Sequence, residues 1–138
     1  MKNEIILKKS FDTLQFGMDV NSVIEKIGKP SEVEEIGGDL EMPATVLYYE
    51  ELGISCFFEN AEQEKLSCIN IESEEVYLFG EQIIDKTSKE IVDLMRKHDI
   101  FEQTMDKEEW GEERISYEES SIDFFFTDNK LTSITIGI

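Results

Sequence analysis

The chain has 138 residues, is 40% hydrophobic and 10% aromatic, and carries 13 Lys and Arg against 32 Asp and Glu, a formal net charge of −19. A chain of this size can bury one core, so we expect a single domain over residues 1–138. The negative field would repel phosphate backbones and anionic lipid surfaces, which argues against nucleic-acid and membrane binding. The same charge keeps a protein soluble or attracts a basic partner, and the two roles are compatible.

The start of the chain predicts neither export nor membrane insertion. Polar residues follow Met1, and the apolar run at 5–7 ends at Lys8, far short of a signal-peptide core or a membrane span. Cys56 and Cys68 are phased to opposite faces of a predicted sheet, so a disulfide between them is not expected. Reduced thiols are typical of a reducing compartment, and we therefore predict a cytoplasmic protein.

The first predicted elements are a leading strand at 4–7 and a short amphipathic helix. Asp19 is a suitable N-cap, the apolar residues after it have helical spacing, and Gly28 and Pro30 end the helix. Three strands follow, with turn residues between them, at 45–50, 54–59 and 66–72.

The second half of the chain repeats this order. A leading strand is predicted at 76–79, and a second helix begins at Thr87, where Glu90 three residues later completes a capping box. Three more strands are then expected at 114–118, 122–127 and 131–138.

These similarities indicate an internal duplication. YEELGISCFFEN at 49–60 and YEESSIDFFFTD at 117–128 are identical at six of twelve positions, and KLSCINI at 65–71 and KLTSITI at 130–136 at four of seven. We therefore predict an α+β domain made of two tandem repeats, each a helix plus antiparallel strands. The strands should form one continuous antiparallel sheet with both helices on one face, and the repeats should span approximately 1–73 and 74–138.

Alternation along the strands separates two faces of the sheet, because successive side chains point to opposite sides. One face is almost wholly apolar and should lie under the helices: Leu47, Tyr49, Ile54, Cys56, Phe58, Ile69, Ile71, Ile115, Tyr117, Ile122, Phe124, Phe126, Ile134 and Ile136. The other face mixes acids, small polar residues and aromatics, and we expect it to be open.

The residues needed for common chemistries are scarce. His98, the only histidine, follows Arg96 and Lys97 at the predicted end of the second helix, where a cation favours the helix dipole; a catalytic base is the less favoured alternative. One histidine and two cysteines cannot build a Cys/His metal site, and the acidic stretch at 106–113 lacks the spacing of a calcium loop. We therefore expect no enzymatic activity, no metal and no cofactor.

Trp110 stands out because it lies in this acidic stretch and not in a predicted strand. One interpretation is a loop residue that folds onto the rim of the core. The other is an aromatic anchor of a protein interface, with Phe57 and Phe125 extending the patch.

The stretch FGMD at 16–19, followed by Val23, Ile27 and the triplet GKP at 28–30, resembles the opening of the repeat in beta-lactamase inhibitor protein-like domains. That superfamily also includes the small SmpA/OmlA outer-membrane lipoproteins. The corresponding stretch at 84–99 lacks the opening Gly and the closing Gly-x-Pro. The resemblance implies a concave sheet that grips a protruding element of another protein, with helices packed behind it. The chain shows neither the export signal and disulfides of the inhibitor nor the lipid-bearing Cys of the lipoproteins, so we do not expect inhibition of beta-lactamase.

Small size, high negative charge and a mixed aromatic and acidic face together predict a non-enzymatic inhibitor, most specifically an immunity protein that neutralises a cognate toxin. Nuclease toxins are basic where they bind phosphate, so carboxylates on the inhibitor would mimic phosphate and steer association. The alternative is a small-ligand or peptide-binding module, or an envelope-assembly factor, that uses the same face. The sequence leaves the oligomeric state open, and the predicted partner-binding residues are Tyr48, Glu50, Phe57, Glu59, Trp110, Arg114, Glu118, Asp123 and Phe125.

Overall fold

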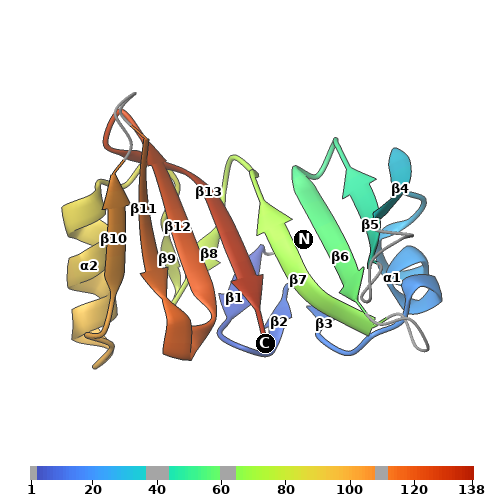
Figure 1. The fold of residues 1–138 in the computed structure, drawn as a ribbon, viewed down its shortest axis with the longest axis horizontal. Coiled ribbons are helices and arrows are strands. Elements are labelled where there is room, and N and C mark those ends of the chain that lie inside the picture. The colour runs from blue at the N-terminus through green and yellow to red at the C-terminus, as the bar shows by residue number, and fades with distance from the viewer. Residues whose placement is uncertain (1–2, 37–43, 60–64, 108–111) are drawn as a thin grey trace.

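A large antiparallel sheet dominates the computed structural model, which describes residues 3–36, 44–59, 65–107 and 112–138. Its eight strands follow the order β10-β11-β12-β13-β7-β6-β5-β4 (Figure 1). The strands are β4 (Glu32–Ile36), β5 (Ala44–Tyr49), β6 (Ile54–Glu59), β7 (Lys65–Ile71), β10 (Thr104–Lys107), β11 (Glu112–Tyr117), β12 (Ile122–Thr127) and β13 (Lys130–Gly137). The six strands predicted for this sheet are present to within two residues, whereas the outer strands β4 and β10 were not predicted.

A second, smaller sheet lies behind the large one, so the expectation of one continuous sheet is wrong. Its strand order is β3-β2-β1-β8-β9, and β1 pairs with β8 in parallel. The strands are β1 (Glu4–Ile6), β2 (Ser10–Phe11), β3 (Leu14–Gln15), β8 (Tyr77–Leu78) and β9 (Glu81–Gln82). The two predicted leading strands thus pair with each other, because the buried side chains of Ile5 and Leu78 pack into the core beneath the large sheet instead of extending that sheet.

Two helices complete the layer behind the large sheet, one toward each end of it (Figure 1). Helix α1 (Val20–Ile27) begins at Asp19, whose carboxylate accepts a hydrogen bond from the Ser22 amide at 2.8 Å. That bond holds the pKa of Asp19 below its ordinary value. Helix α2 (Ser88–Lys97) begins at Thr87 and has the predicted capping box with Glu90. The chain is therefore α+β, with helices and the small sheet together covering one face of the large sheet.

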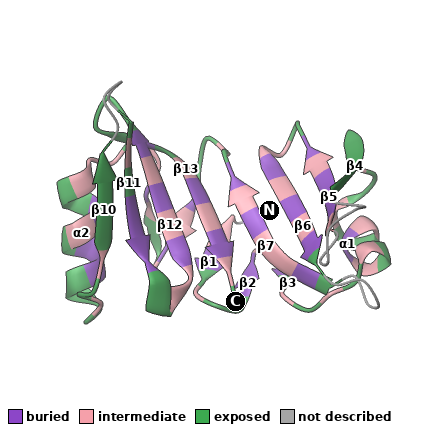
Figure 2. Cartoon of the chain, in the orientation of Figure 1, coloured by how far each residue is buried: buried purple, intermediate pink, exposed green. Residues whose placement is uncertain are grey.

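The core lies between the large sheet and this covering layer. Every residue assigned from the sequence to the covered face is at most 4% exposed, and residues of the small sheet and of both helices belong to the same cluster. Burial alternates along the central strands in the way that the period of two requires (Figure 2). Each fully buried Phe or Ile contributes roughly 1.5–3 kcal/mol of hydrophobic stabilisation. Within the described residues, no helix is long and apolar enough to cross a membrane.

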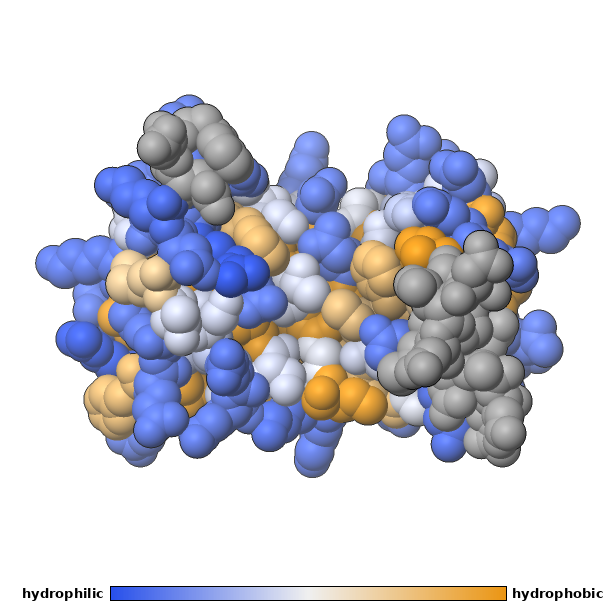
Figure 3. Space-filling model, in the orientation of Figure 1, coloured by the Kyte–Doolittle hydropathy of each residue, from blue (hydrophilic) through white to orange (hydrophobic). Residues whose placement is uncertain are grey.

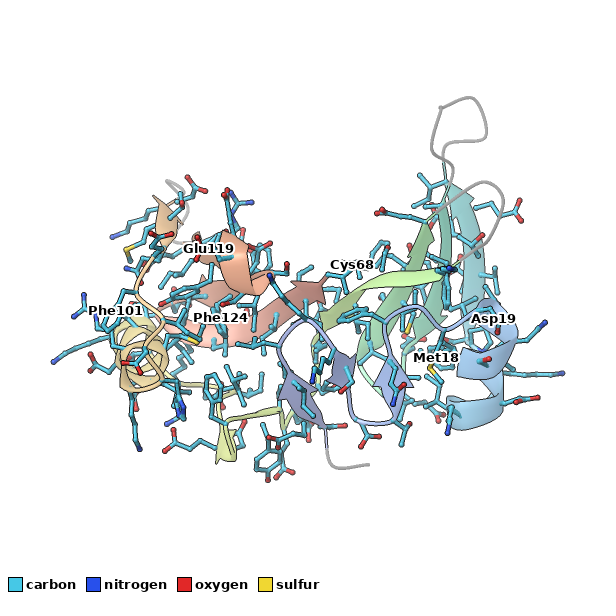
Figure 4. The ribbon with its side chains drawn as sticks, turned by 90° about the horizontal axis from the view of Figure 1, so that it is seen from below. Met18, Asp19, Cys68, Phe101, Glu119 and Phe124 are labelled. Carbon is cyan, nitrogen blue, oxygen red and sulfur yellow. The ribbon has the colours of Figure 1, made fainter. Side chains whose placement is uncertain are left out.

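The large sheet is bent so that its helix-free face is concave, as the view from below shows (Figure 4). Irregularities in strand pairing lie between Phe57 and Phe58 in the β6–β7 pair and between Phe125 and Phe126 in the β12–β13 pair. Extra residues at such points bend strands and increase the local twist. No described element covers the concave face, and we call this surface the open face.

Candidate functional site

A row of polar residues crosses the middle of the open face, one from each of the eight strands. The registers of successive strand pairs place these residues directly beside one another. In order from β10 to β4 they are Thr104, Ser116, Asp123, Thr135, Asn70, Ser55, Tyr48 and Glu32, which we call the polar row. The surface view shows pale side chains mixed with orange, hydrophobic ones in the middle of this face, and mostly hydrophilic ones around it (Figure 3).

Asn70 connects the two central strands of the open face. Its side-chain oxygen accepts hydrogen bonds from the hydroxyls of Ser133 and Thr135 on β13, each at 3.1 Å. Near the β4 edge, the hydroxyl of Tyr48 donates to a carboxylate oxygen of Glu34 at 2.8 Å, and this bond raises the pKa of Tyr48. These parts of the row are therefore held in place by partners within the chain.

Asp123 and Ser116 lie beside each other in the row and lack such partners. Asp123 is half-buried, and its carboxylate makes no hydrogen bond or ion pair with any residue that the structure describes. Ser116 is only 8% exposed, and its hydroxyl also has no hydrogen-bond partner in the described segments. Arg114, the next residue toward the start of β11 on the same face, forms an ion pair with Asp106 of β10.

Hollows flank Asn70 on both sides. One, of about 350 Å³, lies toward β5 and is lined by Tyr48, Ser55, Asn70 and the carboxylates of Glu32, Glu50 and Glu72. Another, of about 570 Å³, lies toward β12 and is lined by Asn70, Glu72, Glu112, Phe125, Thr132, Ser133 and Thr135. Neither hollow is lined by a Lys or Arg of the described segments, so both favour cationic over anionic groups.

The structure places five of the predicted contact residues on the sheet surface itself. Tyr48, Phe57, Arg114, Asp123 and Phe125 belong to strands and face the open side, while the residues that alternate with them are buried, apart from the half-buried Glu113. Phe57 and Phe125 are separated by β7 and β13, which corresponds to roughly 14 Å across the sheet. The two rings are therefore not neighbours on the open face, and Trp110, whose patch they were predicted to extend, is not among the described residues.

The predicted acidic contacts are dispersed. Glu59 ends β6, and Glu50 lies in the turn that follows β5. Glu118 was predicted as the last residue of a strand, but it begins the short 3₁₀ helix η1 (Glu118–Ser120) after β11. Glu50 and Glu118 thus lie in turns at opposite ends of the strands, one in each half of the sheet (Figure 1). Trp110 lies outside the described residues.

The cysteine on the open face is a poor nucleophile. Burial, and then the charges of Glu59 and Asp123, raise the pKa of Cys68 to about 11, so the thiol is protonated at neutral pH. Cys56 is buried in the core, and burial raises the pKa of its thiol to about 12. Both are free thiols. Among the described residues, no group of His, Cys, Asp and Glu side chains is arranged to hold a metal ion.

His98 lies away from the open face, at the end of α2. It caps the helix C-terminus, and its ring stacks on Phe79 with a centroid distance of 3.8 Å. His98 thus lies at the end of α2, where the sequence placed it.

Comparison with known proteins gives a family and a distant structural neighbour. A crystal structure of an extracellular protein containing a SCP domain, from Bacillus anthracis str. Ames, aligns with 95% of this chain at 18% identity and a TM-score of 0.49. The chain spans about half of that structure (49%), and a likeness this weak carries no conclusion about function. No curated protein matches the chain. A family model matches residues 7–137, nearly the whole chain, which therefore belongs to the family described as Domain of unknown function (DUF7738).

Proposed function

We propose that this chain is a non-enzymatic protein-binding module, an inhibitor or immunity protein that neutralises a cognate toxin by gripping it with the open face. The observation that carries the proposal is the concave sheet surface, which spans eight strands, is lined by a continuous polar row and is covered by no described element. A surface of this kind suits a protruding, convex element of another protein. As part of the same proposal we place the chain in the cytoplasm, because Cys56 and Cys68 are both free thiols.

The charge of the chain supports a basic partner. Three carboxylates line the 350 Å³ hollow beside Tyr48, and a further hollow at the neighbouring edge is lined by Glu50, Glu51, Glu72, Glu74 and Glu75. Because this chain has a net charge of −19, it would attract a cationic partner over several ångströms and accelerate its association, most strongly at low salt. A toxin that binds phosphate groups has such a basic surface.

We also propose that the domain is an internal duplication with repeats of approximately 1–73 and 74–138, in the manner of the beta-lactamase inhibitor protein-like superfamily. Two details support it beyond sequence identity. Strand pairing has the same register in both halves, with Tyr49 opposite Ile54 and Tyr117 opposite Ile122. In addition, the amides of Gly17 and Asp85, 68 residues apart, donate to the carbonyls of Leu66 and Leu131.

The duplication matters for function because it makes the open face a composite. Each proposed repeat supplies four strands of the large sheet, and the halves meet where β7 pairs with β13. A partner seated in the concavity would therefore contact both halves, and Asn70 would lie at the centre of the interface.

A small-ligand or peptide-binding module is the second candidate, and the 350 Å³ hollow favours it because that volume falls within the range of small-molecule sites. Against it, the hollow is open and acidic, and its lining is more polar than apolar. Such sites usually enclose a ligand in apolar walls.

The proposal can be tested with variants that fill the concavity. Ser55→Arg combined with Thr135→Arg places two bulky cations in the polar row, whereas Glu25→Arg combined with Asp93→Arg places two on exposed positions of α1 and α2. Partners are captured from cells of the source with each purified variant, and folding is verified by circular dichroism. A partner that binds the wild type and the helix variant but not the open-face variant supports the proposal, and equal binding to both variants contradicts it.

Toxicity separates the two candidate functions. The captured partner is expressed alone and together with this chain, and growth is measured. Growth arrest that co-expression relieves, and that the open-face variant does not relieve, is the expected result for an immunity protein. A harmless partner would favour the alternative function.

A further inference from the structure

Asp123 and Ser116, neighbours on the floor of the open face, lack within the described segments the hydrogen-bond or ion-pair partners that such groups usually have inside a protein. A half-buried carboxylate normally accepts hydrogen bonds or pairs with a cation, because partial removal from water is unfavourable for its charged form. Asp123 does neither with any described residue, and the hydroxyl of the adjacent Ser116, a residue that is 8% exposed, also makes no hydrogen bond there. A carboxylate acceptor and a hydroxyl, which can both donate and accept, therefore face the concavity without a partner among the described residues.

No nearby basic residue of the described segments pairs with the carboxylate of Asp123. Arg114 is the cationic side chain closest along the open face of β11, but it is engaged by Asp106 at the β10 edge. Across the strands, Asp123 lies between Ser116 and the hydroxyl of Thr135, which donates to Asn70. The local charge is thus negative, and it adds, after burial and the charge of Glu59, to the effects that raise the pKa of Cys68.

We propose that Asp123 and Ser116 form the anchor site for an arginine side chain of the protein partner. The inference rests on the proposed function and adds to it the chemistry by which the partner is recognised. The arginine projects from a basic, protruding segment of the partner, enters the concavity and pairs with Asp123, while a second guanidinium N–H donates to the hydroxyl oxygen of Ser116.

Arginine fits this pair better than lysine does. The guanidinium is planar and presents five N–H donors in a fixed fork, so one group can reach acceptors on adjacent strands, which lie roughly 4.8 Å apart. It also keeps its charge in partly desolvated sites and stacks on aromatic rings, and the ring of Phe125 lies two residues along β12 on the same face. A lysine ammonium is a more strongly hydrated point charge and gains less from such an arrangement.

A partner protein is the occupant that the charges favour. A second copy of this chain would bring another −19 charge, which opposes self-association through this face. A side chain that descends to a half-buried position on a concave floor must be long and must be carried by a convex element. The long-range attraction between the acidic chain and a basic segment then guides the arginine toward Asp123.

The test uses a hexa-arginine peptide amide as the probe and the full chain labelled with ¹⁵N. Backbone amide signals are followed by NMR during titration of the wild type, Asp123→Asn and the matched control Asp93→Asn, which removes one exposed carboxylate on α2. We expect the signals of residues 114–117 and 122–126 to shift. Affinity should fall about tenfold in Asp123→Asn, as for loss of a charge-assisted hydrogen bond, and less than about twofold in the control.

Two further arms make the outcome decisive. Hexalysine, with the same charge, should bind about threefold or more weakly than hexa-arginine, and Ser116→Ala should reduce arginine binding without altering the overall fold. Equal affinities of Asp123→Asn and Asp93→Asn, with shifts still on the open face, would overturn the anchor site but leave the proposed function standing. Shifts confined to other surfaces would overturn both, and equal binding of the two peptides would refute the preference for arginine.

Discussion

Replacement of Asn70 by Ala should loosen the connection between the two central strands of the open face. The side-chain oxygen of Asn70 accepts hydrogen bonds from Ser133 and Thr135, both at 3.1 Å. A typical intramolecular hydrogen bond contributes a net stabilisation of about 1 kcal/mol, so two would contribute about 2 kcal/mol. Both hydroxyls are half-buried and can bond to water after the substitution, which reduces the loss. We therefore expect Asn70→Ala to lower the free energy of unfolding by about 1–2 kcal/mol.

Urea unfolding followed by far-UV circular dichroism measures this change. The midpoint should fall while the slope of free energy against urea stays constant, because the surface exposed on unfolding hardly changes. Thr135→Val and the double variant complete a mutant cycle, in which the two substitutions should couple by about 0.5–1 kcal/mol because they remove the same bond. A loss below about 0.3 kcal/mol, or additive effects, would show that the Asn70 bonds do not hold the strands together.

Three other predictions concern single groups. Glu90→Gln should weaken the pH dependence of stability in acid, because the hydrogen bond from the Thr87 amide lowers the pKa of Glu90 in the folded state. The stabilisation that Glu90 contributes is therefore present above the ordinary carboxyl pKa and is lost as the pH falls through the pKa of the folded state. Urea unfolding at about pH 3 and pH 7 tests this, and parallel curves for variant and wild type would contradict it. Glu59→Gln should speed alkylation of Cys68 at about pH 9, measured by mass spectrometry. Burial and then the Glu59 charge raise the pKa of that thiol to about 11, so removal of the charge yields more thiolate. An unchanged rate would argue against this contact. Tyr49→Phe should cost about 1 kcal/mol in thermal unfolding, because the hydroxyl donates to the carbonyl at the end of α1 at 2.8 Å, and a neutral effect would mean that water replaces this bond.

The faces of the central strands could be predicted from the sequence because burial imposes a period of two on them. In β6 and β12, a buried side chain alternates with a half-buried one over five successive residues, and the polar Ser55 and Asp123 at the second position of each strand indicate which face is open. The helix starts could also be predicted from the sequence, since Asp19 and Thr87 both make the capping hydrogen bonds that their positions suggest. Local chemistry is sufficient for both features.

The outer strands and the small sheet left no comparable signal. All residues of β4 and β10 are exposed, so neither strand has a buried face to impose alternation, and the three Glu residues of β4 are unusual in strands. The strands β2, β3, β8 and β9 contain two residues each, too few to show any period. Their pairing depends on contacts between distant parts of the chain, such as Ile5 beside Leu78, and these are set by the tertiary fold.

The candidate site was partly predictable, because the same alternation along the strands assigns residues to one face of the sheet. Alternation placed Tyr48, Asp123 and Phe125 on the open face, as the structure shows. It could not show that Glu50 and Glu118 would fall in turns at opposite ends of the strands, because a strand end is the least certain part of a pattern. Nor could it reveal which polar groups lack partners, since that requires the positions of neighbouring strands.

The two ends of the polar row differ in a way that gives the open face a direction. Toward β4, the bulky ring of Tyr48 occupies the face and its hydroxyl is bound by Glu34, and the residue beside it is the neutral Ser55. Toward β10, the corresponding places are taken by the small Ser116 and by the charged Asp123. Within the polar row, the unpartnered half-buried carboxylate therefore lies on the β10 side, although three exposed carboxylates also line the 350 Å³ hollow on the β4 side. Under the proposed duplication, the shared scaffold provides the concave surface, and these differences between the halves determine where a cationic side chain can enter.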